Sequence, residues 1–182
     1  MDDCRRFHGV PGIADRAFGH LIQRILCPHR KADGFGDFAS TMWGEGKESR
    51  IRVYDQVCYP HSLGLAYLAL TQYLGFMRYG DEYKVMGLAP FGKPTELDAL
   101  RRVVRLKPQG RFELGLEYFL HHSDGVSMVW DHGEPCIGRV YSDEVIRLLG
   151  PARKQDEPLT DHHRNIAASL QAMHEEAFFH VL

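Results

Sequence analysis

The sequence predicts a mixed α/β domain, on the strength of three observations. Residues 50–59 alternate apolar and polar side chains, which is typical of a strand with one buried face. Residues 63–76 are apolar on nearly every side, which indicates a helix buried in a core. Residues 160–182 carry apolar side chains at helical spacing. Strands and helices are therefore expected to share one hydrophobic core.

Composition excludes several classes of protein. The 182 residues are 44% hydrophobic and 25% charged, with a net charge of −2 and no basic block, so neither nucleic acid nor an anionic membrane is an expected partner. No run of 18 apolar residues and no apolar signal segment occur, which predicts a cytoplasmic protein. The four cysteines are scattered without a Cys-x-x-Cys pair, which argues against a disulfide framework or a cysteine zinc site.

The chain is predicted to change character near residue 32. Residues 1–31 differ in composition from the rest and are interpreted as a divergent N-terminal leader, followed by a domain over residues 32–182. A first strand is expected at 38–43, a turn at 44–47, where two glycines alternate with charged residues, and a second strand at 50–59.

The helix predicted at 63–76 has clear boundaries. Ser62 can cap its first N–H groups, and glycines bracket its other end. Glu82 and Lys84 follow in a short segment of mostly apolar and small residues that Pro90 ends. Charged groups in such surroundings have to be paired or to face a polar ligand. The alternative is an ordinary exposed pair on a surface loop.

The second half of the chain alternates between helix, strand and loop signals. We expect a helix at 97–106, a turn at 108–110 and a strand at 111–119. Residues 121–160 are loop-rich, with one short helix at 143–149 and a connector at 151–158. The helix predicted at 160–182 runs to the last residue without a stop signal, so the chain is interpreted as ending within a domain.

Four stretches also carry a family resemblance. Residues 59–65 read Tyr-Pro-His-Ser-Leu-Gly-Leu, and residues 80–92 read Gly-Asp-Glu-Tyr-Lys-Val-Met-Gly-Leu-Ala-Pro-Phe-Gly. Together with residues 33–41 and 165–171, they closely resemble the nodulation and antibiotic O-carbamoyltransferase family, from about Ala32 onwards. Enzymes of that family place carbamoyl groups on hydroxyls of sugars and antibiotics.

The resemblance implies a fold and a reaction. The fold would be part of a lobe of the actin, sugar-kinase and heat-shock-ATPase (ribonuclease H-like) type, with a mixed five-stranded sheet flanked by helices. A C-terminal domain of the family makes carbamoyl-adenylate from carbamoyl phosphate and ATP. The N-terminal domain transfers the carbamoyl group to a hydroxyl of a sugar, nodulation factor or antibiotic, with a divalent metal, expected to be iron, polarising the carbonyl.

The adenylating domain and the C-terminal lobe are expected to be missing partners of this chain. The chain alone is therefore predicted to be an inactive fragment without a tightly bound cofactor. Two alternatives stay open: an ATP-binding module of the same fold with another transfer chemistry, and an inactive remnant of a disrupted gene.

The resemblance also assigns roles to particular residues. Asp33 matches a metal ligand of the family, although an Asp-Gly turn is the alternative and the upstream histidines do not reproduce the family's His-x-x-x-His spacing. Glu82 and Lys84 match nucleotide-contacting positions in the related tRNA threonylcarbamoyl transferases, with Gly87 allowing close approach.

Histidines and serines supply the other candidates. His61 stands at the helix entry, where a neutral imidazole could donate or accept a hydrogen bond toward substrate; a capping or core histidine is the alternative. The adjacent pairs at 121–122 and 162–163 diverge in direction and are predicted to lie at the surface. Ser62 and Ser169 lack histidine and aspartate partners at suggestive spacing, so a hydrolase triad is a weak option.

Overall fold

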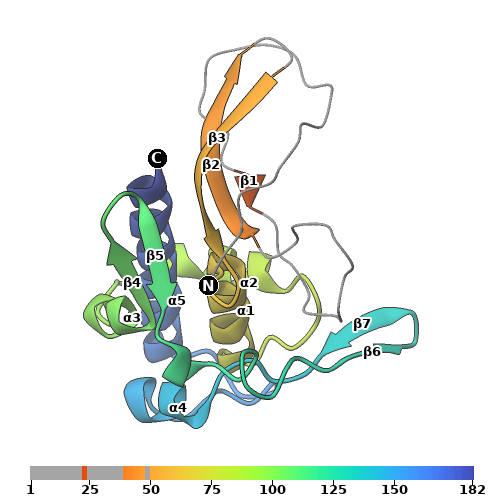
Figure 1. The fold of residues 1–182 in the computed structure, drawn as a ribbon. Coiled ribbons are helices and arrows are strands. Elements are labelled where there is room, and N and C mark those ends of the chain that lie inside the picture. The colour runs from red at the N-terminus through yellow and green to blue at the C-terminus, as the bar shows by residue number, and fades with distance from the viewer. Residues whose placement is uncertain (1–21, 24–38, 48–49) are drawn as a thin grey trace.

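The structure is a computed structural model that describes residues 22–23, 39–47 and 50–182. Helices and antiparallel hairpins alternate along this part of the chain (Figure 1). The helices are α1 (Leu63–Tyr73), α2 (Glu82–Leu88), α3 (Leu97–Val103), α4 (Asp143–Leu149) and α5 (Asp161–Val181), with 3₁₀ turns η1 (Ala89–Phe91) and η2 (Leu116–Tyr118). The strands are β1 (Ile22–Gln23), β2 (Ala39–Lys47), β3 (Arg50–Cys58), β4 (Val104–Lys107), β5 (Arg111–Leu114), β6 (Met128–Asp131) and β7 (Glu134–Ile137).

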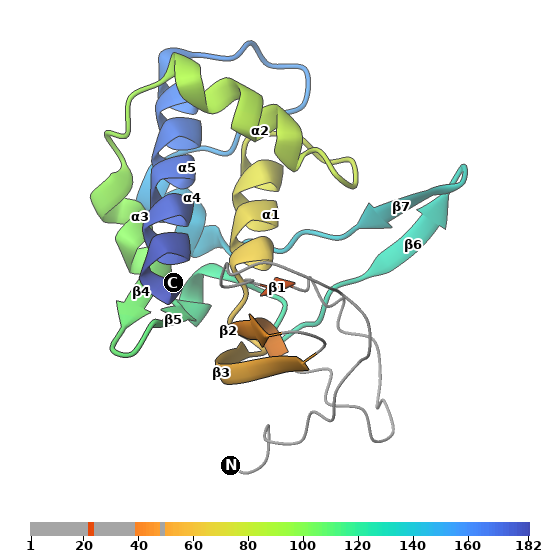
Figure 2. The same cartoon turned by 90° about the horizontal axis from the view of Figure 1, so that it is seen from above.

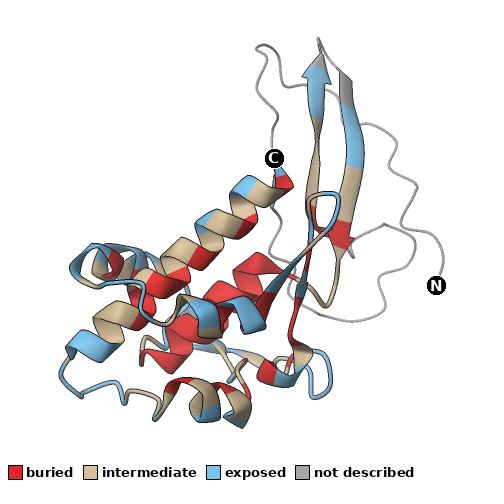
Figure 3. Ribbon diagram, turned by 90° about the vertical axis from the view of Figure 1, so that its left-hand side faces the viewer, coloured by how far each residue is buried: buried red, intermediate tan, exposed pale blue. Residues whose placement is uncertain are grey.

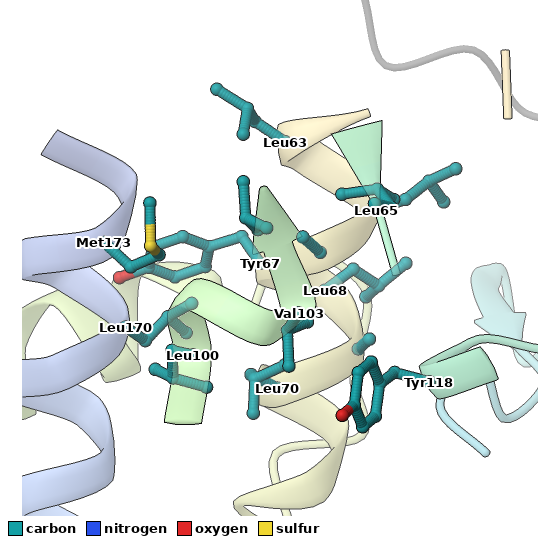
Figure 4. Close-up of a cluster of buried hydrophobic side chains, with 14 of the residues drawn as sticks. Leu63, Leu65, Tyr67, Leu68, Leu70, Leu100, Val103, Tyr118, Leu170 and Met173 are labelled. Carbon is teal, nitrogen blue, oxygen red and sulfur yellow. The ribbon is translucent and has the colours of Figure 1, made fainter. Parts of the chain in front are cut away.

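Helix α1 forms the centre of the core, as its sequence predicts. Every residue of α1 is buried (Figure 3), and the Ser62 hydroxyl caps it by accepting a hydrogen bond from the Leu65 N–H at 3.3 Å. In Figure 4, Tyr67 of α1 points towards Leu170 and Met173 of α5. A helix that is apolar all round has no face for solvent, so neighbouring elements cover it on all sides.

Helix α5 runs beside α1 and holds an irregular stretch of chain (Figure 2). The Asn165 side-chain oxygen accepts from the Lys93 N–H at 2.8 Å, and the Ser169 hydroxyl accepts from the Glu96 N–H at 2.9 Å. A Cβ on Gly92 would lie 2.0 Å from a carbonyl oxygen of α5, so only glycine allows this approach. The helix predicted at 160–182 is confirmed, and its polar residues position the chain between η1 and α3.

The hairpin of β2 and β3 differs from its prediction at one end. The turn predicted at 44–47 is wrong, because β2 continues to Lys47 and pairs with β3 along this length. At a register shift beside Trp43, a Cβ on Gly44 would lie 2.1 Å from the Arg52 carbonyl oxygen. Gly44 therefore permits a close strand contact in place of the expected turn.

Two further boundaries differ from prediction. The helix predicted at 97–106 ends at Val103, and the next four residues form β4, which pairs with β5. The strand predicted at 111–119 ends at Leu114 and gives way to η2. Gly115 stands between them and packs so close to the Arg102 carbonyl that a Cβ would lie 2.7 Å from its oxygen. The helix at 143–149 and the connector after it are confirmed.

The β6–β7 hairpin was not predicted. Its strands lie within the loop-rich stretch 121–160 and are joined through His132 and Gly133, whose φ angles are 46° and 84°. Two successive positive φ angles are characteristic of a tight hairpin turn. The hairpin extends away from the helices in both views (Figures 1 and 2).

The described strands confirm a mixed α/β composition. They form three small antiparallel sheets of three, two and two strands, and not one five-stranded mixed sheet. A lobe of the actin type thus stays a prediction. Among the described residues, no helix combines the length and hydrophobicity needed to cross a membrane.

Candidate functional site

The loop between β3 and α1 carries His61 and is held by several hydrogen bonds. Its first residue, Tyr59, donates from its hydroxyl to the His121 carbonyl at 2.7 Å. The Pro60 carbonyl accepts from the His121 ring at 2.8 Å. The Ser40 hydroxyl on β2 lies within hydrogen-bond distance of the His61 carbonyl. The backbone on both sides of the His61 side chain is thereby fixed.

The hydrogen bonding of His61 determines its tautomer. Nδ1 accepts from the Leu114 N–H at 3.1 Å, and an accepting ring nitrogen carries no proton, so the neutral ring holds its proton on Nε2. Burial is the largest effect on the pKa of His61 and lowers it; Lys107 and His122 lower it further, while Glu113 opposes them. At neutral pH His61 therefore offers an Nε2–H donor and has no free basic nitrogen.

His121 stabilises the loop between β3 and α1 through its hydrogen bond to the Pro60 carbonyl. Its side chain is 1% exposed, so the prediction of a surface residue is wrong for His121, whereas its neighbour His122 is exposed as expected. Because the Pro60 carbonyl can only accept, the His121 proton lies on Nε2. Nδ1 of His121 and the Thr41 hydroxyl are buried without a hydrogen-bond partner among the described residues. Burial is the main cause that lowers the pKa of His121.

Lys84 on α2 is paired within the chain. Its Nζ lies 2.6 Å from Oδ1 of Asp81, a buried carboxylate that also accepts from the Arg78 N–H at 3.1 Å. The ammonium lies 5.8 Å from the ring centroids of both Phe76 and Tyr83. Pairing was one of the two outcomes expected for a charge in this segment.

The rest of α2 lies at the surface. Tyr83 and Met86 are 66% and 50% exposed, and Val85 is the one buried residue of the helix. Of the apolar neighbours of Lys84, Tyr83 and Met86 thus face solvent, whereas Val85 is buried. Residues 82 and 84 are separated by about 200° around a helix, so Glu82 and Lys84 project from opposite sides.

The space over Gly87 is open. A Cβ built on Gly87 would meet no atom within 4 Å. Packing within the described chain therefore does not require glycine at this position. A ligand or partner could approach the backbone closely there.

The predicted site residues form two separate groups. His61 precedes the first turn of α1, whereas Lys84 lies beside Phe76, which follows its last turn. The 11 residues of α1 span about 16 Å between them. The structure thus does not bring His61 together with Lys84.

The predicted metal ligand, Asp33, lies outside the described residues. Within the described part of the chain, no three His, Cys, Asp or Glu side chains are grouped so that they could hold a metal ion. The described residues therefore do not fit a metal site by themselves.

The two candidate serines have structural roles. Ser62 caps α1, and the Ser169 hydroxyl donates to the Asn165 carbonyl at 2.7 Å while accepting from the Glu96 N–H. Both hydroxyls are thus engaged with the backbone, which argues against either as a nucleophile of a hydrolase triad.

Comparison with known proteins decides the family. Residues 22–181 match the family described as carbamoyltransferase N-terminus. This chain belongs to the carbamoyltransferase N-terminal family. The resemblance seen at residues 59–65 and 80–92 is thereby confirmed, and the match begins ahead of residue 32.

Curated relatives of this carbamoyltransferase-family chain come from cyanobacteria and rhizobia. An uncharacterized protein of Synechocystis, sll1178, is 36% identical over 84% of the chain. Nodulation protein NolNO of Sinorhizobium fredii is 34% identical over 82%, and nodulation protein NolO of Bradyrhizobium diazoefficiens is 34% identical over 96%. The chain spans 22%, 19% and 27% of the lengths of these relatives, in the same order.

Proposed function

We propose that this carbamoyltransferase-family chain takes part in transferring a carbamoyl group to a hydroxyl of a sugar, nodulation factor or antibiotic. The donor would be carbamoyl-adenylate, formed from carbamoyl phosphate and ATP by another domain. Family membership supports this reaction class, and similarity to two nodulation proteins supports a saccharide-type acceptor. The chain would contribute part of an actin-type lobe.

The observation that carries a role in the reaction is the fixed tautomer of His61. When an acceptor hydroxyl attacks the carbamoyl carbon, negative charge develops on the carbonyl oxygen. The C–O bond to the acceptor forms as the bond to the adenylate phosphate breaks, AMP leaves with the electron pair, and the hydroxyl proton passes to water. The Nε2–H of His61 would donate to the carbonyl oxygen of the bound donor, and this hydrogen bond would strengthen as negative charge develops in the transition state.

His61 acts as a donor in this proposal and not as a base, because its other nitrogen is engaged with the Leu114 N–H. The family resemblance places a metal ligand at Asp33. Asp33 lies outside the described residues, and those residues do not assemble a metal site by themselves.

Helix α2 is proposed to contact the nucleotide. The Glu82 carboxylate could accept from ribose hydroxyls, and the open space over Gly87 would allow a sugar or base to approach the backbone. Lys84 could reach the nucleotide only by sharing or releasing Asp81, since the two are paired at 2.6 Å.

Binding of a non-hydrolysable carbamoyl-adenylate analogue, measured by calorimetry, tests this proposal. His61→Asn separates the two roles of the imidazole, since the asparagine oxygen can still accept from the Leu114 N–H while the Nε2–H is lost. We expect affinity to fall about tenfold with an unchanged thermal transition, and His122→Asn, on an exposed neighbour, to bind like wild type.

Lys84→Ala probes the second group. Loss of a charged donor should weaken analogue binding by about tenfold to a hundredfold in a folded variant. If His61→Asn and Lys84→Ala both fold and bind the analogue like wild type, neither residue serves the donor. ATP binding that is indifferent to the carbamoyl group would favour another transfer chemistry.

A further inference from the structure

A small cavity lies between the end of α1, the start of α2 and the connector after α4. Its volume is about 210 Å³. Pockets for drug-sized ligands run to roughly 300–1,000 Å³, so this cavity suits a smaller molecule. It is lined by Gly75, Phe76, Met77, Arg78, Asp81, Lys84, Arg153 and Gln155.

The cavity collects positive charge from three separate segments. Arg78, Lys84 and Arg153 line it together with one carboxylate, Asp81. Three cations less one carboxylate leave a net charge of +2. Among the described residues, Asp81 is paired with Lys84, and neither arginine forms an ion pair. Two cations thus face the cavity without a carboxylate partner.

Arg153 is held rigidly while its charge stays uncompensated. Its guanidinium donates to the carbonyls of Leu74 at 2.9 Å, Gln155 at 3.0 Å and Glu157 at 2.8 Å. Carbonyl oxygens fix its position but carry no net charge. The Glu157 carboxylate accepts instead from the Lys154 N–H at 2.9 Å.

Phe76 brings two of the cations together. The Arg153 guanidinium carbon lies 5.4 Å from the Phe76 ring centroid, and Lys84 Nζ lies 5.8 Å from the same centroid. Each contact is within the range of a cation–π interaction. The Phe76 ring thus contacts one cation from α2 and one from the connector after α4.

We propose that this cavity binds a phosphate group, held by Arg78, Lys84 and Arg153. A phosphate carries a charge close to −2 at neutral pH, which matches the net charge of the lining. Two phosphate oxygens can accept hydrogen bonds from the planar guanidinium group of one arginine at the same time. A bound phosphate would share Lys84 with Asp81, so Asp81 limits the affinity.

The phosphate could be free inorganic phosphate or the phosphate of a nucleotide bound at α2. The proposal itself does not rest on carbamoyl transfer, because the cavity and His61 lie at opposite ends of α1. Phosphate binding can therefore fail while donor binding through His61 persists, and the reverse also holds.

A calorimetric titration of the 182-residue chain with sodium phosphate at constant ionic strength tests the site. Arg78→Gln removes the positive charge of an exposed side chain that lines the cavity and should weaken phosphate binding about tenfold. Arg102→Gln, on the exposed surface of α3, is the matched control and should bind like wild type. Circular dichroism verifies that each variant is folded.

Asp81→Asn reverses the sign of the expected effect. Asparagine can still accept from the Arg78 N–H, but it removes the competing charge, so phosphate should bind more tightly, by about tenfold. A merely structural role for Asp81 would not produce tighter binding. The proposal is overturned if wild type shows no saturable binding at millimolar phosphate, if Arg78→Gln matches Arg102→Gln, or if Asp81→Asn binds more weakly.

ATP distinguishes the two sources. Competition between ATP and inorganic phosphate assigns the cavity to a phosphate of the nucleotide. Simultaneous binding of both assigns it to free phosphate.

Discussion

Replacing Gln72 with methionine should destabilise the protein, because this buried amide links α1 to the β6–β7 hairpin. Gln72 is 2% exposed in an otherwise apolar helix. Its Oε1 accepts from the Val140 N–H at 2.8 Å, and its Nε2 donates to the carbonyls of Gly138 at 3.0 Å and Ile137 at 3.3 Å. Gln72→Met keeps the length of the side chain but removes all three bonds.

The expected loss in the free energy of unfolding follows from the backbone groups that lose their hydrogen-bond partner. Val140 is fully buried, so its orphaned N–H costs about 1–3 kcal/mol. The carbonyls of Ile137 and Gly138 are less buried, and the loss of their donor costs about 1 kcal/mol more. Burial of the more apolar methionine side chain offsets about 1 kcal/mol of this cost. The net loss is about 2 kcal/mol, which corresponds to roughly 4–8 °C in Tm for a domain of this size.

Urea unfolding of Gln72→Met beside wild type measures this loss, with the exposed Gln155→Met as the control. Amide hydrogen exchange at Val140 provides a local readout, since its protection should fall in the variant. A loss below about 0.5 kcal/mol with Val140 still protected would show that Gln72 does not hold the hairpin.

Three further predictions concern the helix cap, pH and metal. Ser62→Ala should cost about 1 kcal/mol in urea unfolding, because the first turn of α1 loses its side-chain acceptor; an unchanged midpoint would show that the cap is dispensable. Burial lowers the pKa of His61 and of His121, so the unfolded chain binds more protons than the folded one just below pH 6.5. The free energy of unfolding should therefore decline as pH falls from about 7 to about 5, and His121→Gln should flatten that decline; urea titrations at several pH values with no such slope would contradict it. Because the family's His-x-x-x-His spacing is absent, we predict no tightly bound transition metal, and elemental analysis showing near-stoichiometric metal that is lost on Asp33→Ala would refute this.

Three of the helices could be predicted because their signals are local. α1, α4 and α5 each begin at a serine or threonine cap; α1 continues as an apolar run, and α5 continues with apolar side chains at helical spacing. The short hairpins could not be predicted in the same way. Val103 and Val104 suit either helix or strand, and pairing with β5 decides between them. The β6–β7 turn uses a histidine at positive φ, where Asn or Asp would have been the usual signal.

For the candidate site, the sequence indicated where single residues stand in the chain but not which groups they contact. His61 was identifiable at the helix entry, yet its tautomer depends on a backbone N–H at Leu114, far along the chain. The supporting role of His121 has no sequence signal, because adjacent histidines indicate nothing about which one is buried. The pairing of Lys84 did have a sequence signal, because Asp81 stands three residues earlier, which is the spacing at which helical side chains meet.

Helix α5 has a consequence for the order in which the protein acquires its structure during synthesis. It covers α1 and anchors the chain at Lys93 and Glu96, yet it is translated about 90 residues after α1 ends, a delay of roughly 5–20 s at 5–20 residues per second. Throughout that interval the apolar surface of α1 lacks its largest cover. We therefore expect the nascent chain to expose the apolar surface of α1 until α5 has left the ribosome, and a stall in translation between α4 and α5 to prolong that exposure.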